Sequence, residues 1–199
     1  MKYLIPIFIL CLSTLGFSDE YSDFAKLCTD ADMSFSIPDG FKPVKVKTNP
    51  DVIYQYAVRH ATKKVEIRYS IFSLKEDVRV YEEYQKNKEK KSDTKIVLTD
   101  PNEGYILFAV AVVMNISQSE QTKGITEFKP ADVKHDFNAD WGASYFIENN
   151  SDYGHGYKYS LVVAIHKKNI ANAFIVYLFD DGREIKNEML TSFYNLKFK

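Results

Sequence analysis

The chain has 199 residues and nearly equal numbers of basic and acidic side chains, 26 against 27, which gives a formal net charge of −1 at pH 7. Because there is no excess of positive charge, and because basic residues do not continue along one face of a predicted element, the sequence gives no indication of a nucleic-acid partner. Only two cysteines occur, Cys11 and Cys28, so zinc sites built from several cysteines are excluded.

The first eighteen residues have the three-part pattern of a secretory signal peptide. Lys2 precedes an apolar run over residues 4–15, and small residues occupy the −3 and −1 positions of a cut before Asp19. The run is shorter than the about 20 residues that a membrane-spanning helix needs. We therefore predict a signal peptide at residues 1–18, a secreted or periplasmic protein of a bacterial-type envelope, and no membrane span after cleavage.

Two alternatives to cleavage use the same residues. The apolar run could remain as an uncleaved anchor, or Cys11 could carry a lipid. Lipidation signals usually have a small residue before the cysteine, whereas Leu10 stands there, so the lipoprotein is disfavoured. The mature chain, residues 19–199, is expected to form a single domain with a core of its own. Since only Cys28 remains after cleavage, no intramolecular disulfide can hold it together.

The first elements of the mature chain are predicted to be a short helix, a strand and a turn. Residues 19–28 have amphipathic helical spacing, in which Cys28 is expected as a small buried hydrophobic residue. Apolar residues alternate over 33–37, as in a strand. Pro38-Asp39-Gly40 follows as a turn, because proline presets φ and glycine accepts a positive φ.

Two alternating runs, residues 52–59 and 65–71, are separated by a short polar connection. Such runs predict an antiparallel hairpin. One face of the second run carries Lys64, Glu66 and Arg68. We therefore expect this part of the sheet to meet solvent or only a thin cover.

Two helices are predicted next. An apolar stripe and a favourable charge pair predict one over residues 76–91. Asp100, Pro101 and Glu103 have the order of a helix N-cap, a first helical position and a capping partner. The almost wholly apolar run over residues 105–116 is therefore predicted to be a buried helix, although its β-branched residues would also suit a strand.

The last third of the chain is predicted to be rich in strands. Lys129-Pro130-Ala131-Asp132 opens a short helix, residues 143–148 form a strand, and residues 149–156 form a loop. Residues 157–165 alternate, and residues 170–179 are apolar on both faces. These two runs predict a second hairpin whose later strand is central in its sheet.

A final helix is predicted to cover this hairpin. Asp181 has the position of an N-cap residue, and Ile185, Met189 and Phe193 recur at four-residue spacing. A hairpin covered by an amphipathic helix is typical of a small α+β domain. The predicted fold class is therefore α+β, with a mainly antiparallel sheet and helices on one or both faces.

The opening strand over 33–37, the turn Pro38-Asp39-Gly40-Phe41 and the closing strands followed by residues 182–195 resemble the Mog1p/PsbP-like superfamily. Phe41 stands where that family often has tryptophan. The resemblance implies an antiparallel sheet sandwiched by helices and a binding or assembly role. The superfamily shares no catalytic site, so the resemblance assigns no functional residue.

The sequence lacks the common motifs of nucleotide-binding proteins, zinc proteases and serine hydrolases, and no cofactor or metal site is predicted. His60, in a turn, and His166, at a strand end, are interpreted as surface residues. His135, Asp140 and His155 could meet as base and orienting group or as metal ligands. The alternative hypothesis is therefore an envelope hydrolase or metal-dependent enzyme that uses these three residues.

The favoured hypothesis is a non-catalytic, monomeric binding or assembly module, whose partner is an unknown protein or small ligand. Its predicted contact surface comprises Trp141, Tyr153 and His155. Tyrosine and tryptophan are favoured at binding surfaces, and two glycines beside Tyr153 and His155 leave that loop little covered. The competing interpretation is that these side chains seal the end of the sheet.

Overall fold

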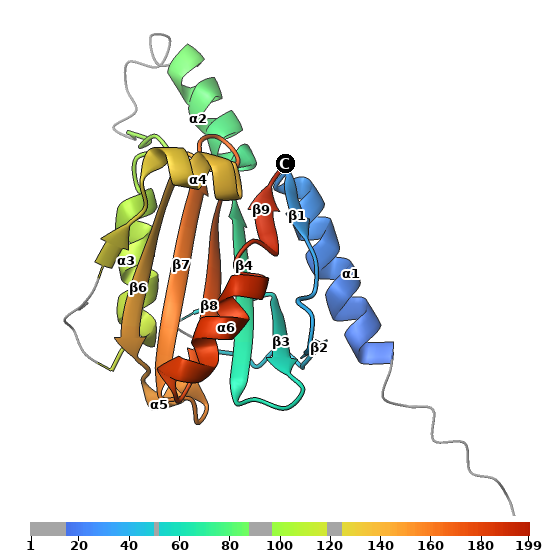
Figure 1. Cartoon of the computed structure of the whole chain (residues 1–199). Coiled ribbons are helices and arrows are strands. Elements are labelled where there is room, and N and C mark those ends of the chain that lie inside the picture. Colours follow the sequence, from blue (N-terminus) through green and yellow to red (C-terminus); the bar gives the residue numbers. More distant parts are fainter. Residues whose placement is uncertain (1–14, 50–51, 88–96, 119–124) are drawn as a thin grey trace, which may run out of the picture.

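The computed structural model describes residues 15–49, 52–87, 97–118 and 125–199 (Figure 1). The helices of this part of the chain are α1 (Leu15–Asp30), α2 (Lys75–Asn87), α3 (Tyr105–Ile116), α4 (Pro130–Phe137), α5 (Ser151–Gly154) and α6 (Gly182–Ser192). Its strands are β1 (Met33–Phe35), β2 (Phe41–Pro43), β3 (Tyr56–His60), β4 (Val65–Ser73), β5 (Ile125–Glu127), β6 (Trp141–Glu148), β7 (Tyr159–Lys167), β8 (Ala171–Phe179) and β9 (Leu196–Phe198).

Seven strands form one antiparallel sheet in the order β2-β3-β4-β8-β7-β6-β5, and β1 pairs with β9 in a separate two-stranded sheet. β8 is the central strand, and all nine of its residues are buried. A tight turn joins β7 to β8, with Asn169 at φ +64° and the amide of Ile170 donating to the carbonyl of Lys167 (3.0 Å). The predicted second hairpin and the central place of its later strand are confirmed.

Helices cover both faces of the large sheet (Figure 1). Because side chains alternate along a strand, β8 contributes to two separate clusters of buried apolar residues. Phe174 and Val176 pack with residues of α3 and α5. Ile175 and Tyr177 pack with residues of α1, α4 and α6. The fold is therefore α+β, with a mainly antiparallel sheet between helices, as predicted.

The predicted first hairpin is present as β3 and β4, although β3 begins at Tyr56 rather than at residue 52. Solvent or a thin cover was expected over the charged face of β4, and the first of these is wrong, because Glu66 and Arg68 are 3% and 0% exposed. The guanidinium of Arg68 lies over two aromatic rings that meet edge to face, 4.8 Å from the centroid of Tyr54 and 4.6 Å from that of Tyr153. These rings, together with α5, exclude water from this face of the sheet.

The predicted helix start at Asp100 is also wrong, whereas the helix itself is present as α3. The carboxylate of Asp100 accepts from the backbone amide of Asn102 (2.9 Å), so this residue closes a turn instead of capping a helix. α3 begins after Gly104, which provides no side-chain cap. The helix is only partly buried, since its outer side leaves Leu107 75% exposed.

Two predictions reach beyond the described residues. Most of the predicted signal peptide, residues 1–14, lies outside them, and so do residues 88–91 at the end of the helix predicted over 76–91. α1 begins at Leu15 and continues past the predicted cut before Asp19, and cleavage stays a prediction. Among the helices that are described, none combines the length and the apolar character that crossing a membrane requires.

Candidate ligand-binding site

The three residues of the predicted contact surface lie at two different ends of the sheet. Trp141 is the first residue of β6, whereas Tyr153 lies in α5 and His155 follows it, beyond the last residue of that strand. An eight-residue strand spans about 26 Å at about 3.3 Å per residue. Tyr153 is also buried, at 1% exposure. The prediction of one surface formed by all three side chains is therefore wrong.

The residues of the enzyme hypothesis are separated in the same way. His135 lies on α4, where its exposed ring contacts Asp136 with Nδ1 2.7 Å from the carboxylate. Asp140 precedes β6 at the same end of the sheet, but His155 lies at the opposite end. The structure thus does not bring the three residues together. Within the described residues, no group of three or more histidines, cysteines, aspartates and glutamates is placed to hold a metal ion.

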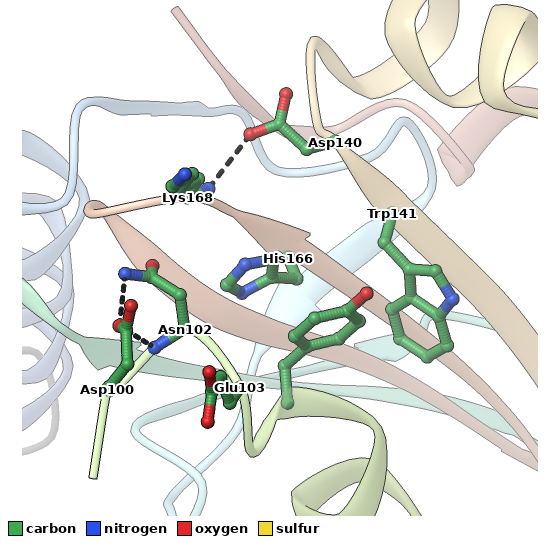
Figure 2. Close-up of a pocket in the computed structure, with 8 residues that line it drawn as sticks. Asp100, Asn102, Glu103, Asp140, Trp141, His166 and Lys168 are labelled. Carbon is green, nitrogen blue, oxygen red and sulfur yellow. Dashed lines mark hydrogen bonds between the residues drawn. The ribbon is translucent and has the colours of Figure 1, made fainter.

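Trp141 instead belongs to a cluster of aromatic rings at the end of the sheet where β6 begins and β7 ends. The antiparallel register pairs Trp141 with His166 of β7. Tyr105, the first residue of α3, stacks on the imidazole of His166 with ring centroids 4.2 Å apart and planes 8° apart. The indole of Trp141 lies 5.1 Å from the ring of Tyr105. Figure 2 shows this end of the sheet, with His166 at the centre of a pocket.

His166 is buried at 4% exposure, so its interpretation as a surface residue is wrong. Its Nδ1 lies 2.9 Å from the side-chain oxygen of Asn172, its cross-strand neighbour on β8. Since an amide oxygen can only accept, Nδ1 donates, and Nε2 of the neutral ring keeps its lone pair. Burial lowers the pKa of His166 below its usual value of 6.5, and this effect outweighs the opposing ones of Asn172 and Asp140.

The polar rim of the pocket comes from three separate segments. Asp100, Asn102 and Glu103 belong to the turn before α3, Asp140 precedes β6, and Lys168 follows β7. Together with Tyr105, Trp141 and His166, these residues line an open pocket of about 480 Å³.

Hydrogen bonds hold this rim in place. The carboxylate of Asp140 accepts from the backbone amide of Lys168 (2.9 Å), and its own amide donates to the carbonyl of His166 (2.9 Å). The side-chain amide of Asn102 donates to Asn169 (2.9 Å), and the backbone amide of Asn169 donates back to the oxygen of Asn102 (2.8 Å). The turn before α3 is thereby fixed to the turn between β7 and β8.

A signal in the sequence points to the burial of His166. Within the alternation of β7, His166 shares its face with Val162 and Ala164, and both of these are apolar residues packed under α3. Because alternate residues of a strand point to the same face, the imidazole of His166 also points to the side of the sheet that α3 covers. Tyr105 gives no comparable signal, because its position depends on where α3 begins.

A hydroxyl, an imidazole and a carboxylate meet at a second place, near the turn after β3. Nε2 of His60 lies 3.4 Å from the carboxylate of Glu188, and Nδ1 lies 3.5 Å from the hydroxyl of Thr62. However, Nδ1 already accepts from the backbone amides of Thr62 (3.2 Å) and Lys63 (3.1 Å). Its lone pair stabilises the turn and cannot serve as a base for Thr62. His60 is also more covered than predicted, with 12% of its side chain exposed.

No protein-family model matches the chain, and no curated protein is similar to it in sequence. The resemblance to the Mog1p/PsbP-like superfamily therefore stays a prediction. What supports a function is the geometry of the pocket around Tyr105, Trp141 and His166.

Proposed function

We propose that the chain is a secreted or periplasmic binding module without catalytic activity, and that it holds its partner or ligand in the pocket formed by Tyr105, Trp141 and His166. The observation that carries this proposal is the cluster of aromatic rings formed by Tyr105, Trp141 and His166. Trp141 is only partly buried although it is the largest side-chain type, and it lines a cavity with polar groups on its rim. Partly exposed tryptophan and tyrosine beside polar groups are typical of binding sites.

The other parts of the proposal have separate support. The envelope location rests on the pattern of the first eighteen residues. A binding rather than a catalytic role agrees with the proposed Mog1p/PsbP-like resemblance, and with the distance between His155 and the pair His135 and Asp140. The proposed contact site excludes Tyr153 and His155, which lie at the opposite end of the sheet.

The test is a capture experiment from an envelope fraction or culture medium of the source cells. The wild-type mature chain and its Trp141→Ala variant are immobilised, and bound proteins and small molecules are identified by mass spectrometry. Phe146→Ala is the matched control, because Phe146 is a half-exposed aromatic residue on the same strand but does not line the pocket. We expect Trp141→Ala to lose what the wild type and Phe146→Ala retain. Equal recovery by all three proteins rejects this pocket as the contact site.

A further inference from the structure

We infer that this pocket takes an organic cation, namely a protonated amine or a guanidinium group. The inference rests on the proposed function of the pocket as a binding site and adds the chemical class of its ligand. It is carried by the combination of a closely stacked aromatic pair, a buried imidazole with a free lone pair, and three carboxylates around the opening.

The charged groups of the rim are mostly acidic. Asp100, Glu103 and Asp140 contribute carboxylates, against the single ammonium group of Lys168. Hydrogen bonds engage Oδ1 of Asp100 and Oδ2 of Asp140, and each aspartate retains a second oxygen. Charged donors such as ammonium and guanidinium form the strongest hydrogen bonds with carboxylates.

The floor of the pocket is electron-rich as well. His166 is more than nine-tenths buried, and no hydrogen bond to its Nε2 occurs among the residues that the structure describes. With Nδ1 committed to Asn172, this nitrogen can only accept while the ring is neutral, and burial favours the neutral ring. The faces of tryptophan and tyrosine rings attract cations, so Trp141 and Tyr105 add to the same preference.

The spacing of the carboxylates suits a group larger than a metal ion. In Figure 2 the carboxylates of Asp100, Glu103 and Asp140 lie around His166 and do not converge on one point. This agrees with the finding that no cluster suited to a metal is present in the described part of the chain. A planar guanidinium or an alkylammonium group can reach several separated acceptors and also contact an aromatic ring.

The test uses the fluorescence of Trp141, which is the only tryptophan of the chain. n-Butylammonium and n-butylguanidinium are titrated into the mature protein to high millimolar concentration, with n-butanol as the neutral probe of similar size. Two further arms distinguish the sources of such a cation. Spermidine represents a free polyamine, and a blocked tripeptide with a central lysine represents a protein side chain, with the norleucine tripeptide as its neutral counterpart.

The variants separate charge from general disruption of the site. Asp140→Asn keeps an oxygen for the amide of Lys168 but removes the charge, and Glu103→Gln changes an exposed residue, so both are expected to fold. Each substitution should raise the dissociation constant of the cationic probes about tenfold, because the loss of one hydrogen bond to a charged group changes a dissociation constant by about that factor. Lys168→Met should strengthen binding. Asp152→Asn, at the opposite end of the sheet, is the control that should leave it unchanged.

Saturable fluorescence changes with the cations but not with n-butanol, weakened in Asp140→Asn and Glu103→Gln, support the inference. Equal responses to n-butanol and n-butylammonium, or no response to any cationic probe, overturn it. If the capture experiment still depends on Trp141 in that case, the pocket remains a binding site for a ligand of another class. If capture is independent of Trp141 as well, the proposed function fails together with the inference.

Discussion

Arg68 shows how single residues determine the interior of this protein. Its charge is buried between one face of the sheet and α5. There Nε donates to the carboxylate of Glu66 (2.8 Å) and Nη1 to the carbonyl of Tyr153 (2.5 Å). The same carboxylate also accepts from Arg59 (2.7 Å). Buried charges are stable only when they are paired in this way.

We predict that Arg68→Ala lowers the free energy of unfolding by about 3–5 kcal/mol, because it leaves the buried carboxylate of Glu66 without its interior partner. Arg59→Ala is the matched control. It removes the other partner of Glu66, but its side chain is 47% exposed, so its cost should stay below about 1 kcal/mol. Urea unfolding followed by circular dichroism measures both, and equal losses would contradict the buried position of Arg68.

His166 gives a prediction about pH. Its proton binds near pH 6.5 in the unfolded chain and only at lower pH in the folded chain, because burial lowers its pKa. Below about pH 6.5 the unfolded state therefore holds more protons, and the free energy of unfolding falls as the pH is lowered. His166→Gln should reduce this slope relative to the wild type. An NMR titration that finds a pKa of 6.5 or higher for His166 would contradict the prediction.

At the residue scale, the burial of a side chain can be predicted when it depends on neighbouring positions in the sequence, and not when it depends on a distant segment. Cys28 is buried as expected, and burial raises the pKa of its thiol to about 12, because its helical spacing already placed it on the apolar face. The covering of Arg68 was not predictable in this way. It depends on Tyr153, which is 85 residues away in the chain.

At the scale of elements, β8 is the strand on which the two cores depend. Phe174 of this strand is 2% exposed and contacts the rings of Phe72 and Phe108, with centroids 6.0 and 5.5 Å away. We predict that Phe174→Ala costs about 3–5 kcal/mol of stability, as for other aromatic core residues. Phe146→Ala, which truncates a 47% exposed ring on β6, should cost clearly less. A near-neutral effect of Phe174→Ala in urea unfolding would mean that β8 is not central.

Elements with a long regular pattern were predicted correctly, whereas a short capping signal misled. β7 and β8 follow from alternation and a tight turn, which are local properties. Asp100 has the sequence context of an N-cap, but an aspartate can equally close a turn on its own backbone. Here the turn is favoured because Asn102 hydrogen bonds to Asn169, a residue 67 positions later. A contact of that range cannot be inferred from the residues around Asp100.

At the scale of the whole molecule, the pattern of elements predicted the α+β fold, but not the assembly of the pocket. The fold follows from alternating strands and amphipathic helices, each visible within a few residues. The pocket requires the register that pairs Trp141 with His166 and the position of α3 that brings Tyr105 over them. Trp141 was selected from the sequence for its residue type, but its neighbours could be known only from the register.

The destination of the whole chain gives a further prediction. We expect export and removal of residues 1–18, because a basic start, an apolar run and small residues before Asp19 form a signal-peptide pattern. The intact mass of the protein recovered from the envelope or the medium should correspond to a chain that begins at Asp19. A chain that still begins at Met1, or an acylated chain that begins at Cys11, would show that the pattern has another role.

The most direct test of the pocket as the contact site is an NMR measurement on Trp141. Because the chain has a single tryptophan, its indole Nε1–H gives one resonance, and this group donates to Glu127 (2.9 Å) beside the pocket. The ligand or partner recovered by the wild-type protein is added to the 15N-labelled mature chain. We predict that the indole resonance and the backbone amides of Tyr105 and Lys168 shift during the titration. Unchanged signals there, with shifts confined to the amides of α5 at the opposite end of the sheet, would contradict the proposed site.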